Sequence, residues 1–199
     1  MWYTTRATGL VALLLLTATV VLGLLTAGRA SGRTWPRFVQ QDLHRRVSIL
    51  TLVFLAIHVL TSVLDTYVHI GWLAIVVPFT SPYERFFVGL GAVSVDLMAA
   101  VMISSFARSR LNPAAWRAIH WLSYLSWPVA VAHSIGTGTD TRLVWVDAMV
   151  AACCLAVVVT AAWRFGRGAM LRRRLAPQPA AVPARSRTRA HIISNGRTG

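Results

Sequence analysis

Long apolar runs separated by short polar gaps make up most of the chain as far as residue 165. A helix needs about 20 residues to cross a hydrocarbon core of about 30 Å. Five runs reach that length, at residues 7–27, 47–66, 86–107, 114–133 and 143–163. A shorter apolar segment at 70–79 is expected to lie in the interface or to re-enter as a cap. The pattern predicts an all-α integral membrane helical bundle with five transmembrane helices.

Two of these helices carry start signals. Ser81 and Glu84 have the spacing of a capping box with Pro82 at the first helical position, which predicts a start for the third helix. Asn112 followed by Pro113 predicts the start of the fourth helix in the same way.

The charged residues indicate which way the helices cross the membrane. Only 13% of the 199 residues are charged, and the Lys+Arg count of 20 consists entirely of arginine. With five spans, three arginines (Arg6, Arg85 and Arg142) fall on one side and the other seventeen on the opposite side. The positive-inside rule places the arginine-rich side in the cytoplasm. We therefore expect the N-terminus outside, the C-terminus inside, and a multi-pass protein of a bacterial cytoplasmic membrane.

The basic residues do not indicate a nucleic-acid partner, because they lie in gaps between apolar runs and in the tail rather than on one folded face. A cleaved signal peptide at the first apolar run would place seventeen arginines outside, so we interpret that run as a span. Residues 1–166 are expected to form the membrane domain, and residues 167–199 a disordered basic cytoplasmic tail. The adjacent Cys153 and Cys154 are expected to pack as small apolar side chains.

Four histidines form two pairs along the chain. His44 and His58 are fourteen residues apart in the second run, and His120 and His133 are thirteen apart in the fourth. The predicted topology makes these two helices parallel, and the spacings correspond to about 21 and 19.5 Å of helix. The histidines can therefore face each other at two depths of the membrane.

The rotational phase of the two spacings differs. Fourteen residues return to within about 40° of the same helix face, whereas thirteen miss it by about 140°. Pro128 lies between His120 and His133, and an internal proline kinks a helix. We expect Pro128 to help turn His133 toward the bundle axis.

Two imidazoles at each depth are suited to hold a haem iron, because neutral imidazole is a good iron ligand and two of them fill both axial positions. The sequence thus predicts two b-type haems, with His44 and His120 at the inner iron and His58 and His133 at the outer. Arg45, Arg46 and Arg117 lie close to the inner ligands and either pair with haem propionates or anchor the cytoplasmic ends.

Other functions are compatible with parts of the pattern. Asp65, Asp96 and Asp147 all fall in the outer half of the predicted bundle, and carboxylates inside a membrane are functional candidates by default. The alternative function is a haem-free, proton-coupled transporter or ion pathway that uses Asp96 and the membrane histidines. A haem-free scaffold subunit whose histidines only pack is the third possibility. His69 and His191 are assigned no defined role.

The strings LHRRVSILTLVFLAIHVL and AIHWLSYLSWPVAVAHSIG resemble the ferric reductase-like transmembrane domain of NADPH oxidases, ferric reductases and a bacterial sulfoxide reductase haem-binding subunit. The likeness covers roughly residues 5–165. It implies that four histidines hold two haems and that electrons pass from a cytoplasmic flavoprotein or quinol to an unknown acceptor outside. Oxidases of this family usually carry a flavin and NADPH domain. The tail is too short for one, so flavin is expected only through a separate partner, and the chain is expected to be an oxidoreductase subunit.

Overall fold

The computed structural model describes residues 2–28, 36–65, 70–137 and 144–175, with side chains as far as Met170. This part of the chain is helical and contains no strand. The elements are α1 (Trp2–Ala27), α2 (Arg37–Val63), α3 (Leu73–Val76), α4 (Arg85–Phe106), the 3₁₀ turn η1 (Arg108–Arg110), α5 (Pro113–His120), α6 (Leu122–Thr137) and α7 (Val144–Leu175). The all-α class predicted from the apolar runs is confirmed.

Within the described residues, four helices are long and apolar enough to cross a membrane: Trp2–Ala27, Arg37–Val63, Arg85–Phe106 and Val144–Met170. The remaining predicted span, 114–133, is divided into α5 and α6. The 16 residues of α6 rise only about 24 Å at 1.5 Å per residue, which is less than the hydrocarbon thickness. Apolar length alone did not reveal this division.

The division between α5 and α6 lies at Trp121, directly after His120. The amide of Tyr124 bonds the carbonyl of Trp121 at 3.0 Å, a tighter turn than the α-helical one. Pro128 lies inside α6 and removes another backbone donor. Two irregularities therefore separate His120 from His133, and they lie where the thirteen-residue spacing requires a change of phase.

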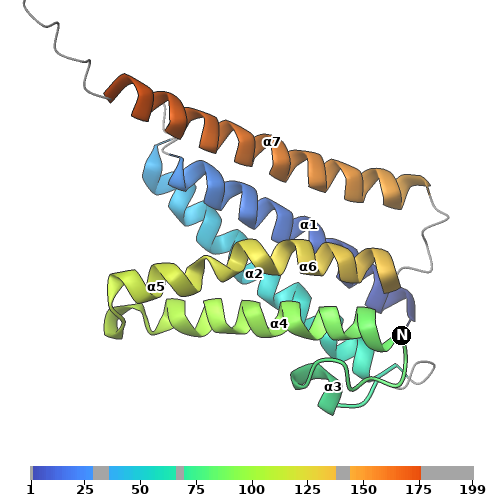
Figure 1. The fold of residues 1–199 in the computed structure, drawn as a ribbon. Coiled ribbons are helices and arrows are strands. Elements are labelled where there is room, and N and C mark those ends of the chain that lie inside the picture. The colour runs from blue at the N-terminus through green and yellow to red at the C-terminus, as the bar shows by residue number, and fades with distance from the viewer. Residues whose placement is uncertain (1, 29–35, 66–69, 138–143, 176–199) are drawn as a thin grey trace, which may run out of the picture.

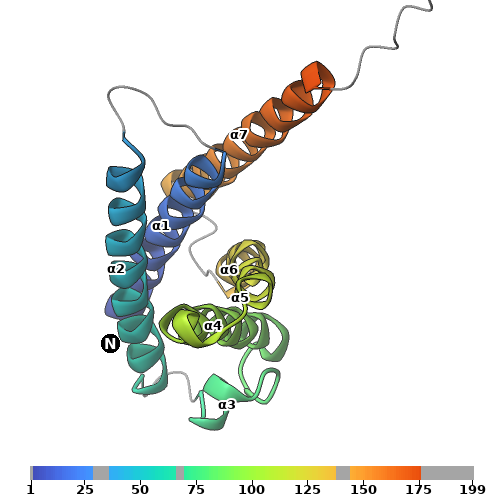
Figure 2. The ribbon, with the colours of Figure 1, turned by 90° about the vertical axis from the view of Figure 1, so that its left-hand side faces the viewer.

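The helices pack as two groups that meet at α1 (Figures 1 and 2). α1 and α2 form a long antiparallel hairpin with α7 against α1, and α4 pairs with α6 in the second group. α1 also touches α6, whereas α2 packs extensively on α1 alone within the described residues. The face of α2 that carries His44 and His58 is therefore left to approach α5 and α6 without close backbone packing.

The core lies around α1. Its buried cluster contains Leu13, Leu16, Val20 and Leu24 from α1, together with Trp127 and Val131 of α6 and Cys153 of α7. Cys153 and Cys154 are free, and both pack in or against this cluster, as predicted. α1 is therefore an integral part of the packed bundle.

The segment after α2 folds over the end of the bundle near α4. α3 is a single turn that packs against α4. The backbone of Phe79 has a positive φ of 65°, and its ring lies directly over Gly89 of α4. Ala74 is buried there. The short apolar segment thus covers one end of the bundle and does not cross it.

One of the two predicted helix starts is wrong. α4 begins at Arg85, because Glu84 adopts a left-handed conformation at φ 37° and caps nothing with its side chain. The Ser81 hydroxyl instead donates to the carbonyl of Tyr83 at 2.8 Å and closes a local turn. The predicted helix start at Asn112 is confirmed. The Asn112 side chain accepts a hydrogen bond from the amide of Ala114 at 2.8 Å, and Pro113 lies in the first turn of α5.

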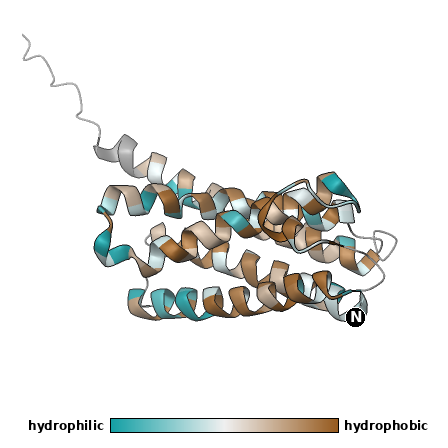
Figure 3. Cartoon of the chain, turned by 90° about the horizontal axis from the view of Figure 1, so that it is seen from below, coloured by the Kyte–Doolittle hydropathy of each residue, from teal (hydrophilic) through white to brown (hydrophobic). Residues whose placement is uncertain are grey.

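Hydropathy varies along the bundle as expected for a membrane protein. Apolar residues cover most of the helices, whereas polar ones gather at the start of α2 and at the connection between α4 and α5 (Figure 3). α7 continues past residue 166 to Leu175, so the helix overlaps the beginning of the predicted tail. His69, Arg142, His191 and the tail from 176 onward lie outside the described residues.

Candidate functional site

The four histidines come together as two pairs at the two ends of the bundle. The ring centres of His44 (α2) and His120 (α5) are 6.5 Å apart, and those of His58 (α2) and His133 (α6) are 6.4 Å apart. The rings within each pair are steeply inclined, at 70° and 74°. Because His44 pairs with the earlier histidine and His58 with the later one, α2 runs parallel to α5 and α6.

The separation of the rings fits a metal held between them. An imidazole nitrogen binds a first-row metal ion at about 2.0–2.1 Å. That nitrogen lies about 1.2 Å from its own ring centre, because ring bonds are about 1.33 Å long. Two imidazoles on opposite sides of one metal thus have centres about 6.4 Å apart. No group of three His, Cys, Asp or Glu side chains able to hold a metal occurs among the described residues. A two-histidine site therefore suits a metal that brings its other ligands with it.

The hydrogen bonds of three histidines define which nitrogen is available. His44 Nδ1 lies 3.1 Å from the carbonyl oxygen of Thr19, and His58 Nδ1 lies 2.8 Å from that of Thr5. His133 Nδ1 lies 2.8 Å from the carbonyl oxygen of Phe87. A carbonyl only accepts, so Nδ1 must carry the proton and donate. Nε2 is left with its lone pair, which is the arrangement typical of metal-ligating histidines.

A glycine lies beside each of these three rings. A Cβ added at Gly9 would come within 2.8 Å of His58 Cε1, and one added at Gly91 within 2.7 Å of His133 Cε1. At Gly23 the same atom would lie 3.4 Å from His44 Cε1, which is an ordinary close contact. The imidazoles therefore pack directly on the backbone of α1 and α4.

His120 is held differently from the other three. Its Nδ1 is buried and has no hydrogen-bond partner among the described residues. The ring stacks on Trp116 of its own helix, with centres 5.0 Å apart and planes inclined by 21°. The guanidinium of Arg108 lies 4.6 Å from the centre of the Trp116 ring. Stacking and a nearby cation replace the carbonyl contact on this side.

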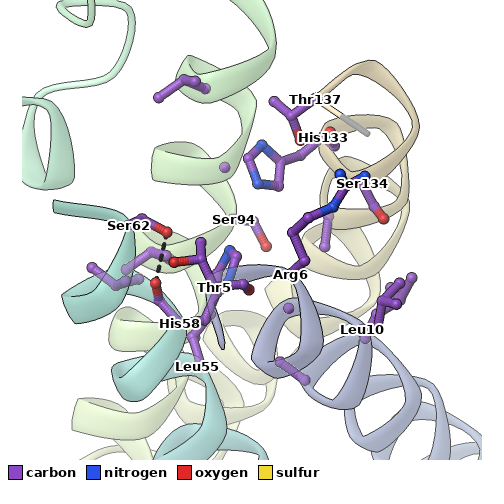
Figure 4. A pocket seen from close by; sticks show the side chains of 18 of the residues that line it. Thr5, Arg6, Leu10, Leu55, His58, Ser62, Ser94, His133, Ser134 and Thr137 are labelled. Carbon is purple, nitrogen blue, oxygen red and sulfur yellow. Dashed lines mark hydrogen bonds between the residues drawn. The ribbon is translucent and has the colours of Figure 1, made fainter. Parts of the chain in front are cut away.

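A cavity of about 530 Å³ opens beside His58 and His133. This volume lies within the range of about 300–1,000 Å³ that is typical of cofactor pockets. The cavity is lined mainly by apolar side chains of α1, α2, α4 and α6, with Arg6, Ser62, Ser94 and Tyr83 among its polar groups. Both imidazoles and Arg6 reach into this space (Figure 4). The cavity can therefore enclose a flat, largely apolar cofactor with an anionic edge.

The arginines singled out from the sequence are exposed. Arg46 bonds Asp42 at 2.7 Å, one turn earlier in α2, and Arg45 and Arg117 are exposed as well. Two further cations lie near the histidine pairs: Arg6, which lines the cavity, and Arg108, which lies over Trp116. Sequence distance from a ligand did not identify them, because both reach their site from other elements.

Two of the three acidic residues singled out from the sequence line the cavity, and the third does not. Asp96 is exposed on α4 and is not among the residues that line the cavity. Asp65 and Asp147 do line it, and Asp65 is buried. The carboxylate central to the transporter alternative therefore lies outside the cavity beside His58 and His133.

The glycines left a signal in the sequence that could have been found. Gly9 and Gly23 are fourteen residues apart, which is the spacing of His58 and His44 on the antiparallel neighbour. Equal spacing on two adjacent antiparallel helices places each glycine beside one histidine, Gly9 at His58 and Gly23 at His44, so the two helices can approach closely at both positions.

The fold and the paired histidines define a multi-span helical membrane protein with two facing two-histidine sites. The family described as ferric reductase like transmembrane component matches residues 8–131, which is more than half of the 199-residue chain. The chain belongs to this family, and membership indicates transmembrane electron transfer. The matched region includes His44, His58 and His120 and ends two residues before His133. Comparisons with curated proteins and with solved structures found no match.

Proposed function

We propose that this protein transfers electrons across a membrane through two bis-histidine haem b groups, as the membrane subunit of an oxidoreductase. The observation that carries the proposal is the pairing of His44 with His120 and of His58 with His133, at 6.5 and 6.4 Å between ring centres. Both separations fit a shared metal, and both occur on the same parallel helices. Packing alone gives no reason for two equal separations about 20 Å apart along the helices.

In this proposal His44 and His120 hold the inner iron, and His58 and His133 hold the outer iron. When bound, each bis-histidine haem supplies one-electron redox chemistry with no open axial position. The carbonyls of Thr5, Thr19 and Phe87 orient three of the rings. The chain has no C-x-x-C-H sequence for covalent attachment, so these side chains and the apolar lining would retain the cofactor.

Arginines would hold the charged edge of each group. Arg6 lines the outer cavity and would pair with a haem carboxylate there, as Arg108 would at the inner site. Arg45, Arg46 and Arg117 are exposed at the inner end and fit the anchoring role better.

The proposed topology has the N-terminus outside and five crossings, of which α5 and α6 together form the fourth. The support is the distribution of arginine, seventeen on one side against three on the other. The donor would then be a cytoplasmic flavoprotein or quinol, and the acceptor would lie outside a bacterial cytoplasmic membrane.

Electron transfer can be measured directly in proteoliposomes that contain the purified protein. With ferricyanide trapped inside and dithionite added outside, the ferricyanide absorbance should fall faster than in protein-free vesicles. The His58→Ala protein, lacking one of the two sites, serves as the control and should approach the protein-free rate. Equal rates in all three preparations would contradict the proposal.

The same vesicles separate the proposed function from the transporter alternative. Asp96→Asn should leave the ferricyanide rate unchanged, because Asp96 is exposed on α4 and does not line the cavity beside His58 and His133. A rate that collapsed in this variant while its haem content stayed normal would favour a proton pathway through Asp96.

A further inference from the structure

Three interior helix positions carry glycine where the helix touches a histidine of its neighbour. Gly9 and Gly23 lie in α1 beside His58 and His44, and Gly91 lies in α4 beside His133. Glycine is unfavourable inside a helix compared with alanine, because it loses more conformational freedom on folding. At Gly9 and Gly91 a Cβ would lie within 3 Å of the imidazole, which indicates a local requirement for space, whereas at Gly23 the contact is looser.

The three contacts share one geometry. The carbonyl that accepts from the histidine belongs to the residue four positions before the glycine: Thr5 before Gly9, Thr19 before Gly23, and Phe87 before Gly91. In an α-helix that carbonyl lies over the turn that ends at the glycine. Without a Cβ at the glycine, the imidazole edge can lie flat on the helix and reach the oxygen. We call this arrangement of carbonyl and glycine a backbone seat.

His120 has no such seat. The antiparallel pairing of α4 with α6 places Ser104 and Ser105 at its level, thirteen and fourteen residues after Gly91. Their hydroxyls donate to the carbonyl of Val101 at 2.9 and 2.7 Å, so that oxygen already has partners. Neither His120 Nδ1 nor Trp116 Nε1 has a hydrogen-bond partner among the described residues, although both atoms are buried.

We propose that Gly9 and Gly91 are positioning residues for His58 and His133, with Gly23 leaving a looser fit beside His44, and that His120 is the one ligand that can be displaced. The inference rests on the proposed bis-histidine sites. A ring fixed by a carbonyl is a better-oriented and more basic ligand, and losing such a contact typically weakens metal affinity 10–100-fold. His120 also ends a short helix, directly before the break at Trp121. Both histidines of the outer site are therefore fixed by backbone carbonyls, whereas at the inner site only His44 is fixed in this way.

The seats can be tested by single Gly→Ala variants of the full-length protein, read by electron paramagnetic resonance and by the midpoint potential of each haem. Gly91→Ala and Gly9→Ala should convert the outer low-spin signal to high spin or lose that haem, since the added Cβ would meet the ring at 2.7 and 2.8 Å. Gly23→Ala should change the inner signal little, at 3.4 Å. The inner haem reports correct folding in the first two variants.

Gly166→Ala is the matched control, because a Cβ at that position meets nothing within 4 Å. It should leave both haem signals unchanged. If Gly91→Ala and Gly9→Ala behave like Gly166→Ala in a protein with two haems, the seats are not positioning devices and this part of the inference is overturned.

The displaceable ligand is tested with carbon monoxide added to the dithionite-reduced protein. The Soret shift of the carbon monoxide adduct should appear for one haem in the wild type, persist in His58→Ala, and be absent in His44→Ala, where only the outer pair remains. A two-haem protein in which carbon monoxide reacts with neither haem, or with both equally, would overturn the inference while leaving the proposed function intact. A protein without haem would contradict the proposed function itself.

Discussion

At the scale of single residues, the contacts behind each imidazole decide what the ring can do. His58 and His133 each donate through Nδ1 to a backbone carbonyl at 2.8 Å, so their Nε2 atoms are presented to the space between α2 and α6. His44 has the same arrangement at 3.1 Å. Side chains that only filled space would have no reason to share one tautomer. The three contacts leave the lone pair of each Nε2 available to bind a metal.

Single replacements of the histidines should remove one haem at a time. His58→Ala and His133→Ala are each expected to halve the haem content, because an iron loses one of only two protein ligands while the other pair remains. His44→Ala should remove the other haem. Pyridine haemochrome assays against protein concentration measure this. Full haem content in all three alanine variants would show that the ligand assignment is wrong.

The residue scale also shows what the sequence does and does not reveal. The spacing of the histidines along two helices was enough to predict which of them meet. It did not identify Arg6, because that side chain reaches the cavity from α1, and adjacency of α1 to α2 and α6 is a tertiary fact. The capping-box prediction at Ser81 and Glu84 also failed, because Ser81 forms a local turn with Tyr83 instead.

At the scale of elements, α1 and the α5–α6 pair do the most to shape the site. α1 supplies carbonyls to His44 and His58 on one face and core side chains on another. α5 and α6 bring His120 and His133 to the same neighbour in spite of a thirteen-residue spacing. Apolar length predicted one helix here, since a break of a single residue does not alter the hydropathy of the run.

Pro128→Ala tests how the phase of His133 is set. Alanine restores a backbone donor and allows α6 to straighten, which should turn His133 away from His58. The outer haem signal should broaden or be lost while the inner signal persists. Pro113→Ala is the control, since Pro113 occupies the first turn of α5, where proline is tolerated. Equal effects of the two variants would assign the change of phase to the break at Trp121 instead.

Leu16→Ala tests the structural role of α1. Leu16 is 6% exposed within the core, so truncation should destabilise the protein by about 2–5 kcal/mol. Thermal release of haem should occur at a lower temperature for both groups together. Leu14→Ala on the same helix is the control, because Leu14 is 43% exposed and should change the release temperature little. Equal shifts for the two variants would contradict the assignment of the core to this face of α1.

At the scale of the whole molecule, two helix groups are joined through α1 (Figure 2). The two histidine pairs lie at opposite ends of the bundle. α2 contributes one histidine to each pair and, in the part of the chain that the structure describes, packs extensively on α1 alone. The all-α class and the family were accessible from the sequence, whereas the predicted count of five long helices was not confirmed, because four of the described helices reach that length. The separation of the two groups was not accessible from the sequence, because it depends on which helix faces remain unpaired.

The orientation of the molecule can be tested by labelling with a membrane-impermeant maleimide in intact cells. In a protein whose two native cysteines are replaced by alanine, Thr80→Cys should react, since it precedes α4 on the proposed outer side. Ser109→Cys, after α4, should react only once the cells are permeabilised. Both positions are exposed, so accessibility within the fold does not limit the comparison. The opposite pattern would invert the topology.

The central claim is that two pairs of histidines hold two haem groups, and the most direct test is the reduced-minus-oxidised optical spectrum of the detergent-purified protein, with iron and protein quantified. Expression in cells supplied with haem precursor ensures that the cofactor is available. The account predicts two low-spin b-type haems per chain. Purified, folded protein with no haem band under these conditions would contradict it.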